Sequence, residues 1–230
     1  MANRERLNNF PGNCPALSCG NRKTEVSGEV AALNSFRGSE YNGTMIDHFR
    51  FLAPLYDILI SPPDTERLQA LLELPAAGTM LDAGGGTGRV SHPLRDLVDD
   101  LIVSDETPAM LRQAREKGLC RTVAAAAECL PFADGAFERV LVVDALHHFA
   151  DQRQAIGELI RVLKPGGRLV VEEPDLKRLT VKFVALAEKV ALMRSRFYAP
   201  EQIAQMMASH GLQPRIERDE RFAAWIVAEK

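Results

Sequence analysis

The hydrophobic pattern of the chain changes at about residue 45. Residues 1–44 are rich in Asn, Gly, Ser and charged side chains and show little periodicity, so we predict a flexible polar leader there. Over residues 45–59 the apolar positions recur at three- and four-residue steps, which predicts an amphipathic helix. A second helical pattern follows a proline-rich break and ends near Leu74. We therefore expect a domain over 45–230 whose first part, residues 45–75, forms a helical lid.

Beyond the lid, short apolar runs alternate with helical patterns. The apolar, β-branched runs predict strands at about 79–83, 100–104, 121–125, 139–143 and 168–172. Between them we predict helices that begin near Gly88, at Thr107-Pro108 and at Asp151, where Gln154 completes a capping box. The fourth run is apolar almost throughout, as expected of a strand that is buried on both faces.

The last part of the chain predicts two helices and a hairpin. The helices are expected at about 177–195 and from Ala199 to near Gly211, so that residues 177–210 form a helical segment beside the substrate. The final runs, about 213–220 and 222–229, look like two antiparallel strands. Strands that alternate with helices predict an α/β fold, a mostly parallel sheet covered on both faces, with an antiparallel strand at one edge.

Composition and charge narrow the function classes. The chain has 46% hydrophobic residues and a net charge of −3, so no basic field favours nucleic acid as a partner. The N-terminus lacks the apolar run of a signal peptide, and no stretch is long enough for a membrane span, which predicts a cytoplasmic location. Four scattered cysteines indicate unpaired thiols rather than a metal site. The oligomeric state is left open.

One segment carries candidate chemistry directly after the first predicted strand. Asp82 is followed by glycines at positions 84, 85, 86 and 88. A dinucleotide fingerprint does not fit, because its last glycine would fall on Arg89 or Ser91, and a phosphate-binding loop would need a Lys that is missing. The exposed N–H groups of such a loop, with the N-terminus of the following helix, suit a carboxylate. The alternative is a tight turn without a ligand.

Five segments in order resemble one family. They are residues 51–57, the glycine segment itself, the acid loop 104–111, the AECLPFADGAFE block at 127–138 and the RVLKPGG turn at 161–167. Together they resemble the class I S-adenosylmethionine (SAM) methyltransferases, closest to the ubiquinone/menaquinone C-methyltransferase-like (type 11) group, over about four fifths of the chain. The resemblance implies a Rossmann-like, seven-stranded, mostly parallel sheet of order 3-2-1-4-5-7-6 with the last strand antiparallel. It also implies SAM as the cofactor.

The resemblance also implies roles for individual residues. Asp82 is expected near the ammonium end of SAM and Asp105 on both ribose hydroxyls. The remaining cofactor residues are expected around the SAM carboxylate and adenine, namely Gly84, Gly86, Thr87, Gly88, Ala126, Ala127 and Glu128. Two positions depart from the family: Ala126 stands where an acid usually reaches the adenine, and Glu106 stands where an apolar residue is usual and is expected to point to solvent. Ordinary turn carboxylates are the alternative for both aspartates.

Candidates for the transfer step follow the fourth predicted strand. His147 and Asp144 are expected as catalytic residues, since a histidine near neutrality suits a general base. His148 and Tyr56 are expected to contact the substrate. The alternative is that one histidine caps the next helix and the other is solvated. After the fifth strand, Glu172, Glu173 and Asp175 form either a second acidic mouth or a solvated loop.

The sequence therefore favours a SAM-dependent methyltransferase that acts on a small-molecule acceptor, such as a quinone-like or other apolar metabolite. Basic residues on one side of the helix predicted over 177–195 suggest transient contact with an anionic lipid surface, or simply a solvated face. A SAM-binding protein without catalysis, acting as a regulator or partner, is the first alternative. An NAD-dependent oxidoreductase is disfavoured by the glycine spacing.

Overall fold

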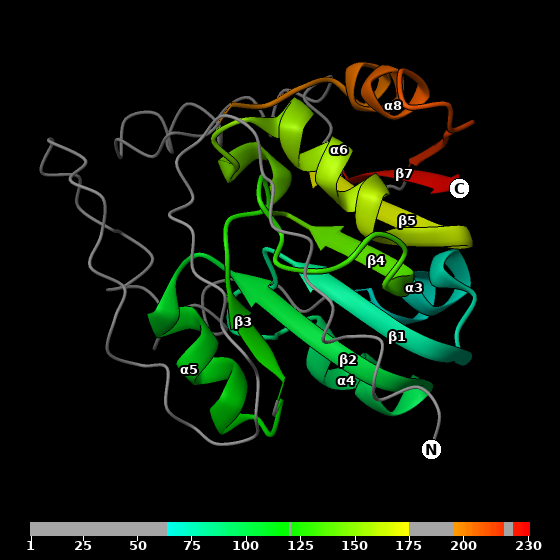
Figure 1. Cartoon of the computed structure of the whole chain (residues 1–230). Helices are drawn as coiled ribbons and strands as arrows, with labels where there is room; N and C mark the ends of the chain where they lie inside the picture. The colour runs from blue at the N-terminus through cyan, green and yellow to red at the C-terminus, as the bar shows by residue number, and fades with distance from the viewer. Residues whose placement is uncertain (1–63, 120, 175–195, 219–222) are drawn as a thin grey trace, which may run out of the picture.

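The computed structural model describes residues 64–119, 121–174, 196–218 and 223–230. Figure 1 shows a twisted central sheet with helices on both sides. The predicted leader, the lid helix with Tyr56, and the helix over 177–195 with its basic side lie outside the described residues. None of the described helices is long and apolar enough to cross a bilayer.

Seven strands form one sheet in the order β3-β2-β1-β4-β5-β7-β6, as predicted. Their bounds are β1 Ala76–Ala83, β2 Val98–Asp105, β3 Thr122–Ala124, β4 Phe137–Val143, β5 Leu163–Pro174, β6 Arg215–Arg218 and β7 Ala223–Glu229. Pairing is parallel from β3 through β5, whereas β7 runs antiparallel to both β5 and β6. The predicted hairpin therefore provides the antiparallel strand, inserted between β5 and the edge strand β6.

The helices divide between the two faces of the sheet. Their bounds are α3 Thr65–Leu72, α4 Ser91–Leu94, α5 Pro108–Glu116, α6 Gln152–Val162 and α8 Pro200–Ala208, with short 3₁₀ turns at Arg95–Leu97 and Leu146–His148. One apolar cluster joins the sheet to α6 and α8, and the other joins it to α3, α4 and α5. In β4, Val140 and Val142 belong to the first cluster and Leu141 to the second, so this strand is buried on both faces as predicted.

The predicted start of α6 is correct, but its cap is built differently. Asp151 is the N-cap, and its side chain accepts the N–H groups of Arg153 and Gln154. Gln154 does not return a bond to Asp151, because its amide donates to the carbonyl of Glu128 at 3.0 Å. The carboxylate of Glu128 instead accepts the N–H of Asp151 at 2.9 Å. These bonds fasten the start of α6 to the loop that follows β3.

Candidate functional site

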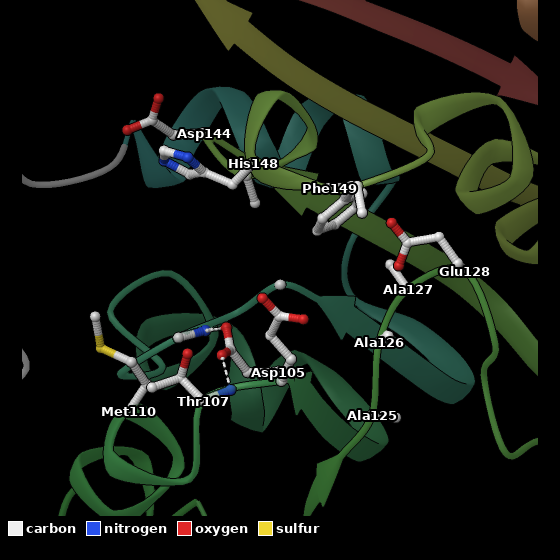
Figure 2. Close-up of a pocket in the computed structure, with 15 residues that line it drawn as sticks. Asp105, Thr107, Met110, Ala125, Ala126, Ala127, Glu128, Asp144, His148 and Phe149 are labelled. Carbon is white, nitrogen blue, oxygen red and sulfur yellow. Dashed lines mark hydrogen bonds between the residues drawn. The ribbon is translucent and has the colours of Figure 1, made fainter. Parts of the chain in front are cut away.

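A pocket of about 650 Å³, open to solvent, lies where β1, β2 and β4 end. Its wall comes from the three segments that follow these strands and from the loop after β3, as Figure 2 shows. The position matches the switch point of a doubly wound sheet, where the chain leaves β1 toward β2 on one side and β4 lies on the other. Ligands of open α/β sheets bind at such crevices.

The glycine loop forms the floor of this pocket. Gly84 N–H donates to the carbonyl of Ser104 at 2.8 Å, which anchors the turn to the end of β2. Gly84 has a φ of +71°, and a Cβ there would lie 2.8 Å from the Cβ of Ala145. Gly86 has a φ of +56°, and the single atom within 4 Å of a Cβ there would be a carboxylate oxygen of Asp105. The floor is therefore bare backbone at Gly86, where a ligand can approach closely.

The helix expected near Gly88 begins later and is shorter. The backbone keeps a positive φ at Gly88, and α4 starts only at Ser91 and has four residues. Such a short helix has little dipole to offer. The N–H groups of the four loop glycines already donate within the protein, to the carbonyls of Ser104 and Gly85 and to the carboxylate of Asp105. Thr87 is buried, and neither it nor Gly88, which packs closely against Leu119, lines the pocket.

Asp82 lies beneath the loop rather than in the pocket wall. Its side chain is 1% exposed, and Ser91 donates its hydroxyl to it. A Cβ on Gly85 would come within 2.6 Å of the Asp82 carboxylate, so the glycine covers it directly. Burial raises the pKa of Asp82 to about 6, against the opposing effect of the Ser91 hydrogen bond. Asp82 therefore supports the loop from below.

Asp105 ends β2 and faces the pocket. One of its oxygens accepts the N–H of Thr107 at 2.7 Å, and the other accepts the N–H of Gly86 at 3.0 Å. These two bonds fix the plane of the carboxylate (Figure 2). A carboxylate has about four acceptor positions, so both oxygens can still accept hydroxyls from a ligand. A vicinal diol such as that of ribose fits this arrangement.

The loop after β3 supplies a flat wall with little side-chain bulk. Ala125, Ala126 and Ala127 line the pocket, and the carboxylate of Glu128 is turned toward the start of α6. Small side chains leave room for a planar group to lie against the backbone. The first of the predicted adenine residues, Ala126, is exposed and the next two are buried.

Sequence reasoning missed several pocket residues. Met110 and Phe149 line the pocket and add apolar surface, and Glu106, expected to point to solvent, lines it as well. Phe149 directly follows the two histidines, so its position after β4 could have predicted that it lines the pocket. Met110 carried a weaker signal, because a buried methionine in a helix is usually a core residue.

The charge of the lining distinguishes between classes of ligand. Four acidic residues line the pocket, Asp105, Glu106, Glu128 and Asp144, and none of the described lining residues is Lys or Arg. Such a pocket attracts a cation and repels a pyrophosphate. SAM carries a sulfonium and an ammonium against one carboxylate and therefore fits. The acidic lining adds a second argument, besides the glycine spacing, against a dinucleotide.

The three candidates after β4 occupy different positions. Asp144 and His148 line the pocket, and Asp144 has a φ of +51°, a conformation that aspartate tolerates better than most residues. His147 is 2% exposed, does not line the pocket, and bonds Glu173 through Nδ1 at 2.8 Å. Neither histidine caps α6, because Asp151 does so. The geometry therefore places His148, rather than His147, in contact with the pocket.

His148 is half-buried, which affects its protonation. Burial, and secondly the neighbouring His147, lower the pKa of His148 to about 3. Its imidazole is therefore neutral at physiological pH. Among the residues described, no group of three or more His, Cys, Asp or Glu side chains is arranged to hold a metal ion.

Comparisons with known proteins agree with this geometry. A family model described as "Methyltransferase domain" matches residues 81–171. The ubiquinone/menaquinone biosynthesis C-methyltransferase UbiE of Enterobacter sp. (strain 638) is 30% identical over 188 residues, which cover 73% of this chain and 71% of that protein. The demethylmenaquinone methyltransferase of Thermus thermophilus is 37% identical over 139 residues, 54% of this chain and 63% of that protein. The chain thus spans under two thirds of the Thermus relative.

The fold is shared with solved methyltransferase structures. One, described as a SAM-dependent methyltransferase and possible histamine N-methyltransferase from Thermotoga maritima, matches with a TM-score of 0.66 at 21% identity. The match covers 79% of this chain and 98% of that one. At this identity the likeness shows the fold alone.

Proposed function

The chain belongs to the class I SAM-dependent methyltransferases, and we propose that it transfers the methyl group of SAM to a small apolar acceptor bound beside the cofactor. The observation that carries the proposal is the lining of the pocket, which combines a bare glycine floor, a fixed carboxylate at Asp105 and an excess of acidic groups. A cationic nucleoside with an amino-acid arm satisfies all three features. A dinucleotide would place its phosphates among carboxylates.

We assign the cofactor contacts from the site geometry. Asp105 would bind the ribose hydroxyls, and the backbone of Ala126, Ala127 and Glu128 would flank the adenine. The loop from Gly84 to Gly88 would hold the amino-acid end, with Asp82 supporting it from beneath Gly85. The fixed plane of the Asp105 carboxylate and the bare backbone at Gly86 support this assignment.

The transfer step needs alignment more than activation. SAM supplies a methyl group that its positive sulfur already makes electrophilic. In the reaction the bond between that methyl carbon and sulfur breaks while the bond to the acceptor atom forms. The chain holds the acceptor in line and excludes water, which contributes most of the rate enhancement available to such a displacement. Where the acceptor atom carries a proton, His148 is the imidazole that lines the pocket and can accept a hydrogen bond from it, but its lowered pKa makes it a weak base.

The acceptor is proposed to be apolar and of quinone type. The relatives from Enterobacter and Thermus have names that refer to ubiquinone and menaquinone compounds. Phe149, Ala145 and Met110 give the pocket apolar surface that suits a ring. A ring carbon that gains a methyl group must then lose its proton, so a proton acceptor near the acceptor ring is required.

The same reasoning supports a small molecule as the only class of acceptor. The net charge of −3 and the acidic pocket disfavour a nucleic-acid substrate.

The test is binding followed by turnover. Calorimetry with SAM and with NADH should show binding of SAM only. Release of S-adenosylhomocysteine should then be measured with reduced quinones, phenols and amines as acceptors, using SAM labelled in its methyl group. Failure to bind SAM at millimolar concentration would contradict the assignment of the pocket.

A second candidate is a SAM-binding protein without catalysis. Ala126 favours it, because the usual acid near the adenine is missing at that position and one hydrogen bond, about 1 kcal/mol, is lost. Binding of SAM without release of S-adenosylhomocysteine for any acceptor would support this candidate over the enzyme.

A further inference from the structure

One buried acidic residue near the site has no part in the function proposed so far. Glu173, near the end of β5, is 3% exposed, and its Oε2 lies 2.8 Å from Nδ1 of His147. Its other oxygen, Oε1, is buried and makes no hydrogen bond to any described residue. Burying a carboxylate is costly unless its oxygens are paired, so this oxygen needs a reason.

The direction of Glu173 follows from the alternation along β5. Val171 belongs to the apolar cluster on the side of α6 and α8, whereas Val170 belongs to the cluster on the opposite face. Since side chains alternate along a strand, Glu173 points to the α6 and α8 face and Glu172 to the other. The two neighbouring carboxylates of β5 therefore face different surroundings.

The ring of His147 contacts two other rings. It stacks on Phe197 with centroids 4.4 Å apart and an interplanar angle of 16°. The centroid of the His148 ring lies 4.0 Å from that of His147. The carbonyl of His147 also accepts the N–H of Arg196 at 2.8 Å. The bond between Nδ1 and the Glu173 carboxyl group fixes the orientation of the His147 ring.

We propose that Glu173 and His147 are positioning residues that act through His148, holding its imidazole toward the methyl acceptor. The inference rests on the proposed function. His148 lines the pocket, His147 packs directly against it, and Glu173 fixes His147 from the protein interior. A purely structural role explains the pair poorly, since buried polar pairs are often no more stabilising than apolar residues of the same volume.

Several titratable groups face this arrangement. The ring of His148 contacts the ring of His147, which in turn bonds Glu173. The acidic residues that line the pocket beside His148 are Asp105, Glu106, Glu128 and Asp144. A substitution of Glu173 would therefore affect the acceptor through the contact between the rings of His147 and His148. A change in any of the pocket carboxylates would act on the cofactor as well.

The proposal is tested by a double-mutant cycle on the full chain. The variants are Glu173→Gln, His148→Asn and the two combined, with Glu172→Gln as the matched control on the opposite face of β5. We expect Glu173→Gln to lower kcat about tenfold, because a misplaced group costs rate, while the Kd for SAM stays within about twofold. The same change should have no further effect in the His148→Asn background, because residues that act through one another are not additive.

Two results would overturn the proposal. One is an equal loss of kcat from Glu173→Gln with and without His148. The other is a kcat for Glu173→Gln equal to that of the Glu172→Gln control. Thermal denaturation checks that each variant folds, and His147→Gln replaces Glu173→Gln in the cycle if the latter does not, with the same expected non-additivity.

A readout without turnover separates this proposal from the function on which it rests. The ring resonances of His148, assigned by their loss in His148→Asn, should shift in Glu173→Gln and stay in place in Glu172→Gln. If the wild-type protein methylates no acceptor, the proposed function fails while these resonances still report the contact. Unchanged His148 resonances in Glu173→Gln would overturn the positioning role.

Discussion

The two ends of the pocket are built in different ways. At the end proposed for the cofactor, the pocket is lined by backbone of the glycine loop and by the carboxylate of Asp105, which accepts the N–H groups of Thr107 and Gly86. At the end proposed for the acceptor, the pocket is lined by side chains that follow β4, and His147 behind them contacts Glu173 of β5 and the ring of Phe197. The first end depends on local chain geometry and the second on packing between distant segments. Changes at the first should affect cofactor affinity, and changes at the second should affect turnover.

The largest effect is expected from Asp105→Ala. Removing a carboxylate that accepts two hydroxyls costs about 3 kcal/mol, so the Kd for SAM should rise about 100-fold. Calorimetry measures the change, with Asp96→Ala as the control because the side chain of Asp96 is 87% exposed. Unchanged affinity in Asp105→Ala would remove the basis for the cofactor end as assigned.

Gly84→Ala tests how closely the glycine loop packs against the segment that follows β4. The new Cβ would lie 2.8 Å from Ala145 in a backbone with positive φ, which should lower the free energy of unfolding by about 3 kcal/mol. Gly166→Ala is the matched control, since Gly166 has a φ of +76° and nothing within 4 Å of a Cβ. Urea denaturation gives both values, and their difference isolates the contact. Equal losses would mean that backbone strain alone is responsible.

Asp82→Asn should change how stability depends on pH. The pKa of Asp82 in the folded protein, about 6, lies above its ordinary value of 3.8. The contribution of Asp82 to folding stability is therefore fully present below pH 3.8 and is lost as pH rises through 6. The amide cannot ionise, so the stability of the variant relative to wild type should increase between about pH 4 and pH 7, by about 2 kcal/mol.

Denaturation at several pH values follows this difference. Asp96→Asn serves as the exposed-carboxylate control, and the same slope in that variant would assign the effect to overall charge rather than to the buried group.

The smallest change is expected in the ring resonances of His148 of the wild-type protein near neutral pH. Because its folded pKa is about 3 and its ordinary value is 6.5, folding favours the neutral ring, and its contribution to stability is lost as pH falls from about 6.5 toward 3. Its ring resonances should stay constant from about pH 8 to pH 5 and move only below about pH 4. A titration midpoint near 6.5 would show that the acceptor end is wetter than its packing indicates.

The difference between the two ends also explains what sequence could predict. The sheet order was implied by the resemblance, and its parallel strands with a closing antiparallel hairpin followed from apolar runs that alternate with helical patterns. The place of Asp105 at the pocket followed from its position at the end of a strand. These features depend on short segments whose conformation is set by neighbouring residues.

Other features depended on tertiary contacts and could not be predicted. The pattern after Gly88 predicted a helix there, but positive φ values at glycines delay α4 to Ser91. The sequence pointed to His147 as the base and to His148 as a substrate contact, and only the structure shows that His147 bonds Glu173 and is enclosed. The contact roles of individual site residues stay predictions.

The bonds at the start of α6 bear on the kinetic order of the two substrates. Glu128 belongs to the wall expected against the adenine, and it is tied to Asp151 and Gln154 at the start of α6, just after the segment that carries His148 and Phe149. Binding at the adenine wall should therefore rigidify the loop that receives the second substrate. Initial-rate kinetics should then show SAM adding before the acceptor, with S-adenosylhomocysteine leaving last.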